Sequence, residues 1–405
     1  STGMYNRVFF QVAMANQFLR ETTSDKLAER GHQALADEIA VFRAEARFLR
    51  ALSYWNGLDL FGDIPLVTDA DELGAIPPQQ ETRERVLEYV VGELQTIRGE
   101  LPAVGQAQFG RADQGAVAML LAKAYMNSEV YTRGLVPAYS EALAEVELVL
   151  AGPYQLATSY QDNFLVGNEA SPELIFAVPQ DGDNARSWGG TTFLTHASCG
   201  TNADTGALGL DFCWWGLRIQ PEIVTLFPNP EASPDSRAIF FTDGQQGMDI
   251  DNLTDFTTGY QSHTYRNTGG NNVTHASVNY PFFRLGDAYL MYAELALRGA
   301  GGSTGQAVTY INALRERAYG DQSANITEGD LDLQFVLDER ARELYWEGQR
   351  RMDLIRYGLF TGGSYLWQWK GGVQAGQSVG DQFNLYPLPA AELSANPNLT
   401  QNPGY

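Results

Sequence analysis

Lysine, histidine and cysteine are scarce in this chain of 405 residues. Lysine occurs three times, at Lys26, Lys123 and Lys370, against 24 arginines. Acidic residues outnumber basic residues by 49 to 27, which gives a formal net charge of −22. Because binding to phosphates needs a basic surface, this charge argues against general nucleic-acid binding and against binding to an anionic membrane by charge alone.

Long apolar runs and metal-binding motifs are also missing. The most apolar stretch, 116–126, is about two helical turns too short to cross a bilayer and contains Lys123. The four histidines are scattered and no CxxC pair exists, so a zinc site has little support. Cys199 and Cys213 lie 14 residues apart and fit either a disulfide, in an oxidising compartment, or two buried thiols.

The sequence does contain long helical patterns, in which apolar residues recur at helical spacing. Successive patterns are joined by short connections, which favours antiparallel pairs and a mainly α-helical, helical-hairpin scaffold. The expected helices cover residues 4–20, 36–60, 82–99, 113–130, 138–151, 284–298, 304–319 and 330–357.

Between residues 152 and 281 this periodicity fades, and glycine, asparagine, aspartate, serine and threonine become frequent. Within this stretch we expect a strand at Leu174–Val178 and a short helix at Pro221–Phe227. The sequence therefore predicts a single domain, 1–405. Its parts are a helical scaffold at 1–151 and 282–357, an irregular ligand-facing insert at 152–281, and a wrapping loop segment at 358–405.

Motifs of catalysis are weak. Residues 301–305 match G-x-S-x-G, but a predicted helix precedes them, so they fit a hairpin loop better than a nucleophile elbow. Asp249, Asp251, Asn252 and Asp255 could chelate calcium, but their spacing departs from an EF-hand loop, and a solvated acidic loop fits better. We therefore predict no catalytic residue, no metal site and no cofactor.

Three segments of the chain resemble signatures of the SusD/RagB family, in the family's order. These are 43–51 with 60–67, then 339–356, then the end of the chain from Leu388–Pro389 through 396–405. The intermediate stretches 221–224 and 284–294 agree too.

The resemblance implies a TPR-like scaffold in a nutrient-binding lipoprotein on the outer surface of a Bacteroidetes-type outer membrane. It further implies that the protein is no enzyme, and that it delivers glycans to a SusC-like TonB-dependent transporter. RagB-like members bind peptides instead. The implied lipid anchor would lie on a cysteine ahead of Ser1.

Two other classes compete with this interpretation. A helical-toroid glycosidase would have a regular ring of similar helices, which the insert interrupts. A TPR-type scaffold for protein tails would rarely carry an insert rich in tryptophan.

The aromatic residues of the insert and of the tail are the candidate ligand site. Aromatic faces meet the C–H patches of sugar rings, while amides and carboxylates bind the hydroxyl groups. The i, i+2 spacing of the last two candidates would place both on one side of a strand. The candidates are Trp188, Trp214, Trp215, Tyr260, Trp367 and Trp369.

The charged residues of the signatures are expected to be structural, because desolvated charges must pair or bond to the backbone. Glu347 and Arg351 would form an i, i+4 pair on one continuous helix. The set is Glu45, Arg47, Arg50, Glu339, Arg340, Glu347 and Arg351.

Overall fold

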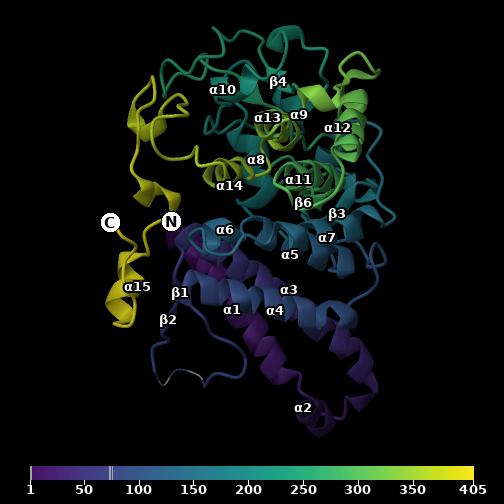
Figure 1. Cartoon of the computed structure of the whole chain (residues 1–405), viewed down its shortest axis with the longest axis vertical. Coiled ribbons are helices and arrows are strands. Elements are labelled where there is room, and N and C mark those ends of the chain that lie inside the picture. The colour runs from purple at the N-terminus through teal and green to yellow at the C-terminus, as the bar shows by residue number, and fades with distance from the viewer. Residues whose placement is uncertain (1, 73, 75) are drawn as a thin grey trace. The chain divides into compact units, whose positions relative to one another are not determined.

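The computed structural model describes residues 2–72, 74 and 76–405, which form two compact units (Figure 1). The first unit contains residues 1–107, 111–148 and 380–405, and the second contains 108–110 and 149–379. Residues 1, 73 and 75, which the predicted domain includes, lie outside the described residues. No helix of the described part has both the length and the apolar character needed to cross a membrane.

The first unit is built from helices that pack on one another in sequence. Helix α1 packs on α3, α3 on α4, and α4 on α5. Thr82 and Asp113 accept hydrogen bonds from Arg85 N and Ala116 N, and so cap α4 and α5. The elements are α1 (Thr2–Glu21), α2 (Ser24–Glu29), α3 (Ala36–Phe61), β1 (Ile64–Pro65), β2 (Gln80–Glu81), α4 (Arg83–Ile97), α5 (Gln114–Met126), α6 (Ser128–Tyr131), α7 (Tyr139–Leu150) and α15 (Ala390–Ala395).

The last residues of the chain bind to the end of α3 within this unit. Tyr386 N donates to Leu60 O at 2.8 Å, and Asn402 Nδ2 donates to Phe61 O at 2.9 Å. Gly62 ends α3 with a φ of 74°, in the left-handed region that glycine tolerates. Residues 380–405 thus pack on the helix whose own end resembles a family signature.

The second unit combines short strands with helices. Strands β3 and β6 pair antiparallel, with Val178 opposite Tyr280, and α11 packs on both α12 and α13. The elements are β3 (Leu174–Val178), α8 (Gly190–Ala197), α9 (Thr205–Leu208), α10 (Pro221–Val224), β4 (Phe240–Phe241), β5 (Gln261–Ser262), β6 (Tyr280–Arg284), α11 (Leu285–Leu297), α12 (Thr304–Tyr319), α13 (Leu333–Leu344) and α14 (Arg350–Arg356).

The mainly α-helical prediction is confirmed, and so is the strand at Leu174–Val178. The helix at 330–357 is wrong as one piece, since α13 ends at Leu344 and α14 begins at Arg350. In between, Tyr345 is extended, and Trp346 and Gly348 have φ values of 69° and 73°. The helix at 221–227 ends already at Val224, and α8 was not predicted.

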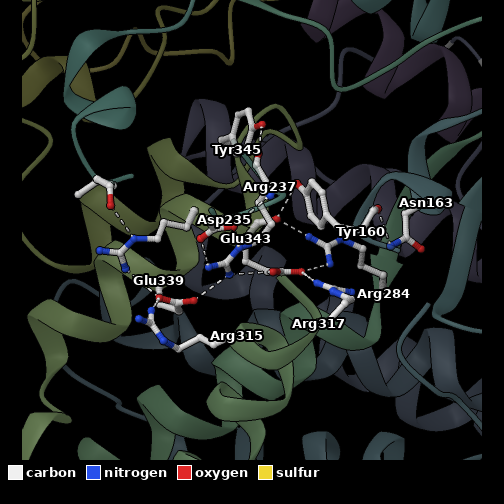
Figure 2. A network of polar contacts seen from close by, with 12 residues as sticks. Tyr160, Asn163, Asp235, Arg237, Arg284, Arg315, Arg317, Glu339, Glu343 and Tyr345 are labelled. Atoms are coloured by element: carbon white, nitrogen blue, oxygen red, sulfur yellow. Dashed lines mark hydrogen bonds and ion pairs between the residues drawn. The ribbon is translucent and has the colours of Figure 1, made fainter. Parts of the chain in front are cut away.

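The insert does not lie outside the helices as predicted. It packs on α13, because side chains of the insert bind buried carboxylates of that helix. Arg237, from the insert, donates to Glu339 at 2.8 Å and to Glu343 at 3.1 Å (Figure 2). Tyr160 Oη donates to the backbone oxygen of Glu343 at 3.0 Å. Residues 152–281 and the helices of 282–357 therefore share one buried interior. That the whole chain forms a single domain stays a prediction.

Ion pairs hold six of the seven signature charges, as predicted for structural residues, and the Arg351 guanidinium lies 5.5 Å from the centroid of the Phe360 ring. Arg47 and Arg50 both bind Glu93, and Arg111 binds Glu45. Arg340 binds Asp287 at 3.0 Å and Asp353 at 2.9 Å. The predicted ion pair between Glu347 and Arg351 on one helix is wrong, because α13 ends before Glu347. The carboxylate of Glu347 binds Arg284 instead.

Candidate ligand-binding site

A disulfide organises the loop that follows α8. Cys199 and Cys213 are bonded, and both are buried together with Leu208 and Leu210. The sequence left the choice between a disulfide and two thiols open, and the structure contains the disulfide. The bond fixes both ends of the 199–213 loop at the end of α8.

Aromatic side chains gather beside this disulfide. The ring centroids of Trp188 and Trp214 lie 5.9 Å apart with their planes inclined by 46°. Phe193 and Phe212 lie 6.2 Å and 6.5 Å from Trp214, and His275 lies 4.5 Å from Trp188. We call Trp188, Phe193, Phe212, Trp214 and His275 the aromatic patch.

Three members of the patch are open to solvent. Trp188 is 59% exposed, Phe212 48% and Phe193 43%, while Trp214 is half-buried between them. Large apolar side chains clustered on a surface mark a binding site more often than chance exposure. Trp215, next in sequence to Trp214, is 52% exposed but makes no ring contact among those found for the described residues.

Hydrogen-bonding groups flank the patch. Asp211, next to Phe212, accepts a hydrogen bond from Thr274 Oγ1 at 2.6 Å, and Thr274 precedes His275. Asp183 accepts from Asn271 at 3.2 Å. These carboxylate, hydroxyl and amide groups are exposed or half-buried, so they can bind the hydroxyl groups of a ligand that covers the rings.

Tyr260 does not belong to this surface. Its ring is buried in a cluster with Ile219, Val224 and Phe227, and its hydroxyl donates to Glu231 at 2.8 Å. Burial, with the neighbouring Glu231, raises the pKa of Tyr260 to about 12. Tyr260 is therefore a core residue of the insert and not part of its surface.

Neither of the two tail tryptophans lies on a strand, and Trp369 lies in a turn. Trp369 has a φ of 65°, and its Nε1 donates to Ile250 O at 2.9 Å. Trp367 packs 5.5 Å from Phe360 and lines a cavity of about 230 Å³. This cavity shares no lining residue with the aromatic patch.

An arginine already occupies the centre of the acidic loop. The Nη atoms of Arg218 donate to the carbonyl oxygens of Asn252, Leu253, Asp255 and Thr258 at 2.6–3.1 Å. Across the described residues, no group of three or more histidine, cysteine, aspartate or glutamate side chains is arranged to hold a metal. The guanidinium of Arg218 therefore organises this loop.

The G-x-S-x-G segment joins α11 to α12. Ser303 caps α12, and its hydroxyl accepts a hydrogen bond from Gln306 N at 3.3 Å. The segment is thus the helical hairpin loop that the preceding helix predicts.

Sequence reasoning missed Phe193, Phe212 and His275, which complete the patch, and His196, which lies under it. None of the four has a spacing in the sequence that would set it apart. Phe193, His196 and Phe212 lie close in sequence to Trp188, Cys199 or Cys213, and that signal has meaning only once the cysteines are paired. His275 has no such neighbour in sequence.

Comparisons with known proteins give consistent matches. The model of the SusD family matches residues 244–405. The starch-binding protein SusD of Bacteroides thetaiotaomicron is 33% identical over 455 residues, which cover 99% of this chain and 78% of that protein. A SusD-like protein of Formosa agariphila is 28% identical and covers 92% of this chain and 74% of its own length.

Solved structures have the same fold. A SusD superfamily protein from Parabacteroides distasonis superposes with a TM-score of 0.77 at 24% identity, covering 99% of this chain and 85% of that chain. Surface glycan-binding protein A from Bacteroides thetaiotaomicron, in complex with laminarihexaose, gives a TM-score of 0.71 at 24% identity, covering 90% and 79%.

Proposed function

Because the chain belongs to the SusD family, we propose that it is a binding protein, not an enzyme, which captures oligosaccharides at the aromatic patch. The observation that carries this proposal is the group of exposed rings at Trp188, Phe193 and Phe212 around Trp214. The relative that is 33% identical is named for binding starch, which supports a carbohydrate ligand.

The geometry of the patch suits a sugar chain. Trp188 and Trp214 present ring faces inclined by 46°, so two successive sugars can each lie on one ring. Each contact is worth about 1 kcal/mol, and three to four contacts correspond to a dissociation constant in the millimolar range. Hydrogen bonds from sugar hydroxyls to Asp211 and to the hydroxyl oxygen of Thr274 add selectivity for polyols.

The exposed candidate Trp215 extends the proposed surface, because it follows Trp214 directly and is half-exposed. Trp367 and Trp369 form no part of it in this proposal. Their rings belong to a separate cavity and to a hydrogen bond with the backbone of Ile250.

Family membership also supports a partner and a location. The protein would sit on the exterior of the outer membrane of a Bacteroidetes bacterium, held by an N-terminal lipid ahead of Ser1. A SusC-like TonB-dependent transporter would bind the protein there and take up the captured glycan.

A peptide is the alternative ligand, as in RagB-like members. The patch favours the glycan, because the groups beside its rings are carboxylates, hydroxyls and amides. Together these groups can both accept hydrogen bonds from sugar hydroxyls and donate to them. Tryptophan fluorescence titrated with maltoheptaose, laminarihexaose and mixed hexapeptides tests this choice. Saturable changes with a glycan are expected, and saturable changes with peptides alone would overturn the proposal.

The partner is tested separately. Purification of the lipid-modified protein from native outer membranes should bring a TonB-dependent transporter with it. Recovery of the protein alone, under detergents that keep other membrane complexes intact, would count against delivery to such a transporter.

A further inference from the structure

A buried histidine lies against the central ring of the aromatic patch. His196, in the last turn of α8, is fully buried, and its imidazole stacks on Trp214 with centroids 4.8 Å apart and planes inclined by 19°. The contacts of Trp214 with Trp188, Phe193 and Phe212 are all tilted by 45° or more. One face of Trp214 therefore rests on His196, and the other rings touch it obliquely.

The imidazole is itself held by the loop that carries Trp214. Its Nδ1 lies 2.8 Å from Phe212 O. Because a carbonyl oxygen only accepts, Nδ1 carries the proton and donates it to this bond. Nε2 has no hydrogen-bond partner within the described part of the chain, so the ring is oriented by Phe212 and Trp214.

The backbone of the same loop is fixed to the end of α8. Trp214 N donates to His196 O at 2.9 Å, and Trp215 N donates to Cys199 O at 3.2 Å. The disulfide joins Cys199 to Cys213, which lies between Phe212 and Trp214. His196 and the disulfide thus hold the two sides of one short segment, residues 212–215.

We infer that His196 is a positioning residue for ligand binding, which holds the Trp214 ring in its binding orientation through the disulfide-closed loop. This inference rests on the proposed function, since it concerns the same patch. A ring that is ordered before the ligand arrives loses less conformational entropy on binding. The ordering of one side chain corresponds to about three- to ten-fold in affinity.

Isothermal titration calorimetry, which measures the affinity for maltoheptaose and for laminarihexaose, tests the inference. His196→Ala removes the stack and should weaken binding about three- to ten-fold. His196→Phe keeps a stacked ring and should bind within about two-fold of the wild type. His196→Asn keeps a donor for Phe212 O but not the ring, and should bind as weakly as the alanine variant.

A matched control is available in the same unit. His263 is also buried, and its ring stacks at 4.9 Å and 27° on Phe241, which is not a member of the aromatic patch. His263→Ala should lower the melting temperature like His196→Ala but leave both affinities unchanged. Loss of affinity in both variants to the same extent would overturn the inference, because it would then reflect lost stability alone.

Removal of the disulfide gives a second test of the inference, which does not depend on whether the His196 variants fold. The double variant Cys199→Ser, Cys213→Ser frees the loop and should weaken binding at least as much as His196→Ala. Wild-type affinity in either variant overturns the positioning role. Failure of the wild type to bind either glycan would contradict the proposed function instead, so the two failures can be told apart.

Discussion

Arg284 donates to both carboxylate oxygens of Glu347, from Nε at 2.7 Å and from Nη2 at 2.7 Å. Both side chains are buried, and Arg284 Nη1 also reaches Glu343 at 2.6 Å and Glu173 at 2.8 Å. These contacts join β6, the insert and the end of α13 in one network, part of which Figure 2 shows.

Three arginines of this network bind the carboxylate of Glu343. It accepts hydrogen bonds from Arg237, Arg284 and Arg317, and despite the opposing effect of burial these guanidiniums hold its pKa at about 2. Glu343→Gln would remove one counter-charge shared by three buried guanidinium groups. We expect the free energy of unfolding to fall by about 3–5 kcal/mol in urea titrations.

The control for this prediction is an exposed pair on α4, Arg85 with Glu88, whose side chains are 60% and 67% exposed. Glu88→Gln should change stability by no more than about 0.5 kcal/mol. Equal effects of the two substitutions would mean that the buried network does not stabilise the second unit.

Two glycines should respond to alanine with opposite signs. Gly348, between α13 and α14, has a φ of 73°, so alanine there should cost about 1–2 kcal/mol. Gly92 lies exposed in the middle of α4 with open space around it, and alanine there should add about 0.5–1 kcal/mol. Thermal unfolding of both variants checks this, and a shared sign would contradict the backbone assignment.

His263 should make stability depend on pH. Burial, together with nearby Arg266, lowers the pKa of His263 to about 4, against about 6.5 in the unfolded chain. Between these values the unfolded state binds more protons, so stability rises with pH across this window and is lost as pH falls from 6.5 to 4. The loss should reach about 3 kcal/mol.

The measurement for this prediction is the difference in unfolding free energy between wild type and His263→Phe as a function of pH. Taking the difference removes the contribution of carboxylates that titrate in the same range. The wild type should lose stability relative to the variant on acidification from 6.5 to 4. A difference that does not change with pH would show that His263 is not held neutral.

Local patterns predicted most of the helices, from apolar residues at helical spacing, and the strand at Leu174–Val178, from a short continuous apolar run. They could not predict the break after Leu344. Residues 345–349 carry no proline, and the turn is stabilised by Glu347 binding Arg284, 63 residues away in sequence. Such a contact depends on tertiary structure.

The candidate site was predictable in part, for a similar reason. Tryptophans in a polar insert pointed to Trp188, Trp214 and Trp215, which lie at or beside the patch. Tyr260 has similar neighbours in sequence but is buried, because its ring fills a cluster with Ile219 and Val224. Phe193 and Phe212 become neighbours of Trp214 only through the folded loop after α8.

The most direct test of the account is isothermal titration of maltoheptaose and laminarihexaose into the double variant Trp188→Ala, Trp214→Ala, beside Trp367→Ala as a matched loss of a tryptophan. We predict that the double variant loses measurable binding, while Trp367→Ala binds like the wild type. Undiminished glycan binding by the double variant, with both variants folded, would contradict the assignment of the aromatic patch as the ligand site.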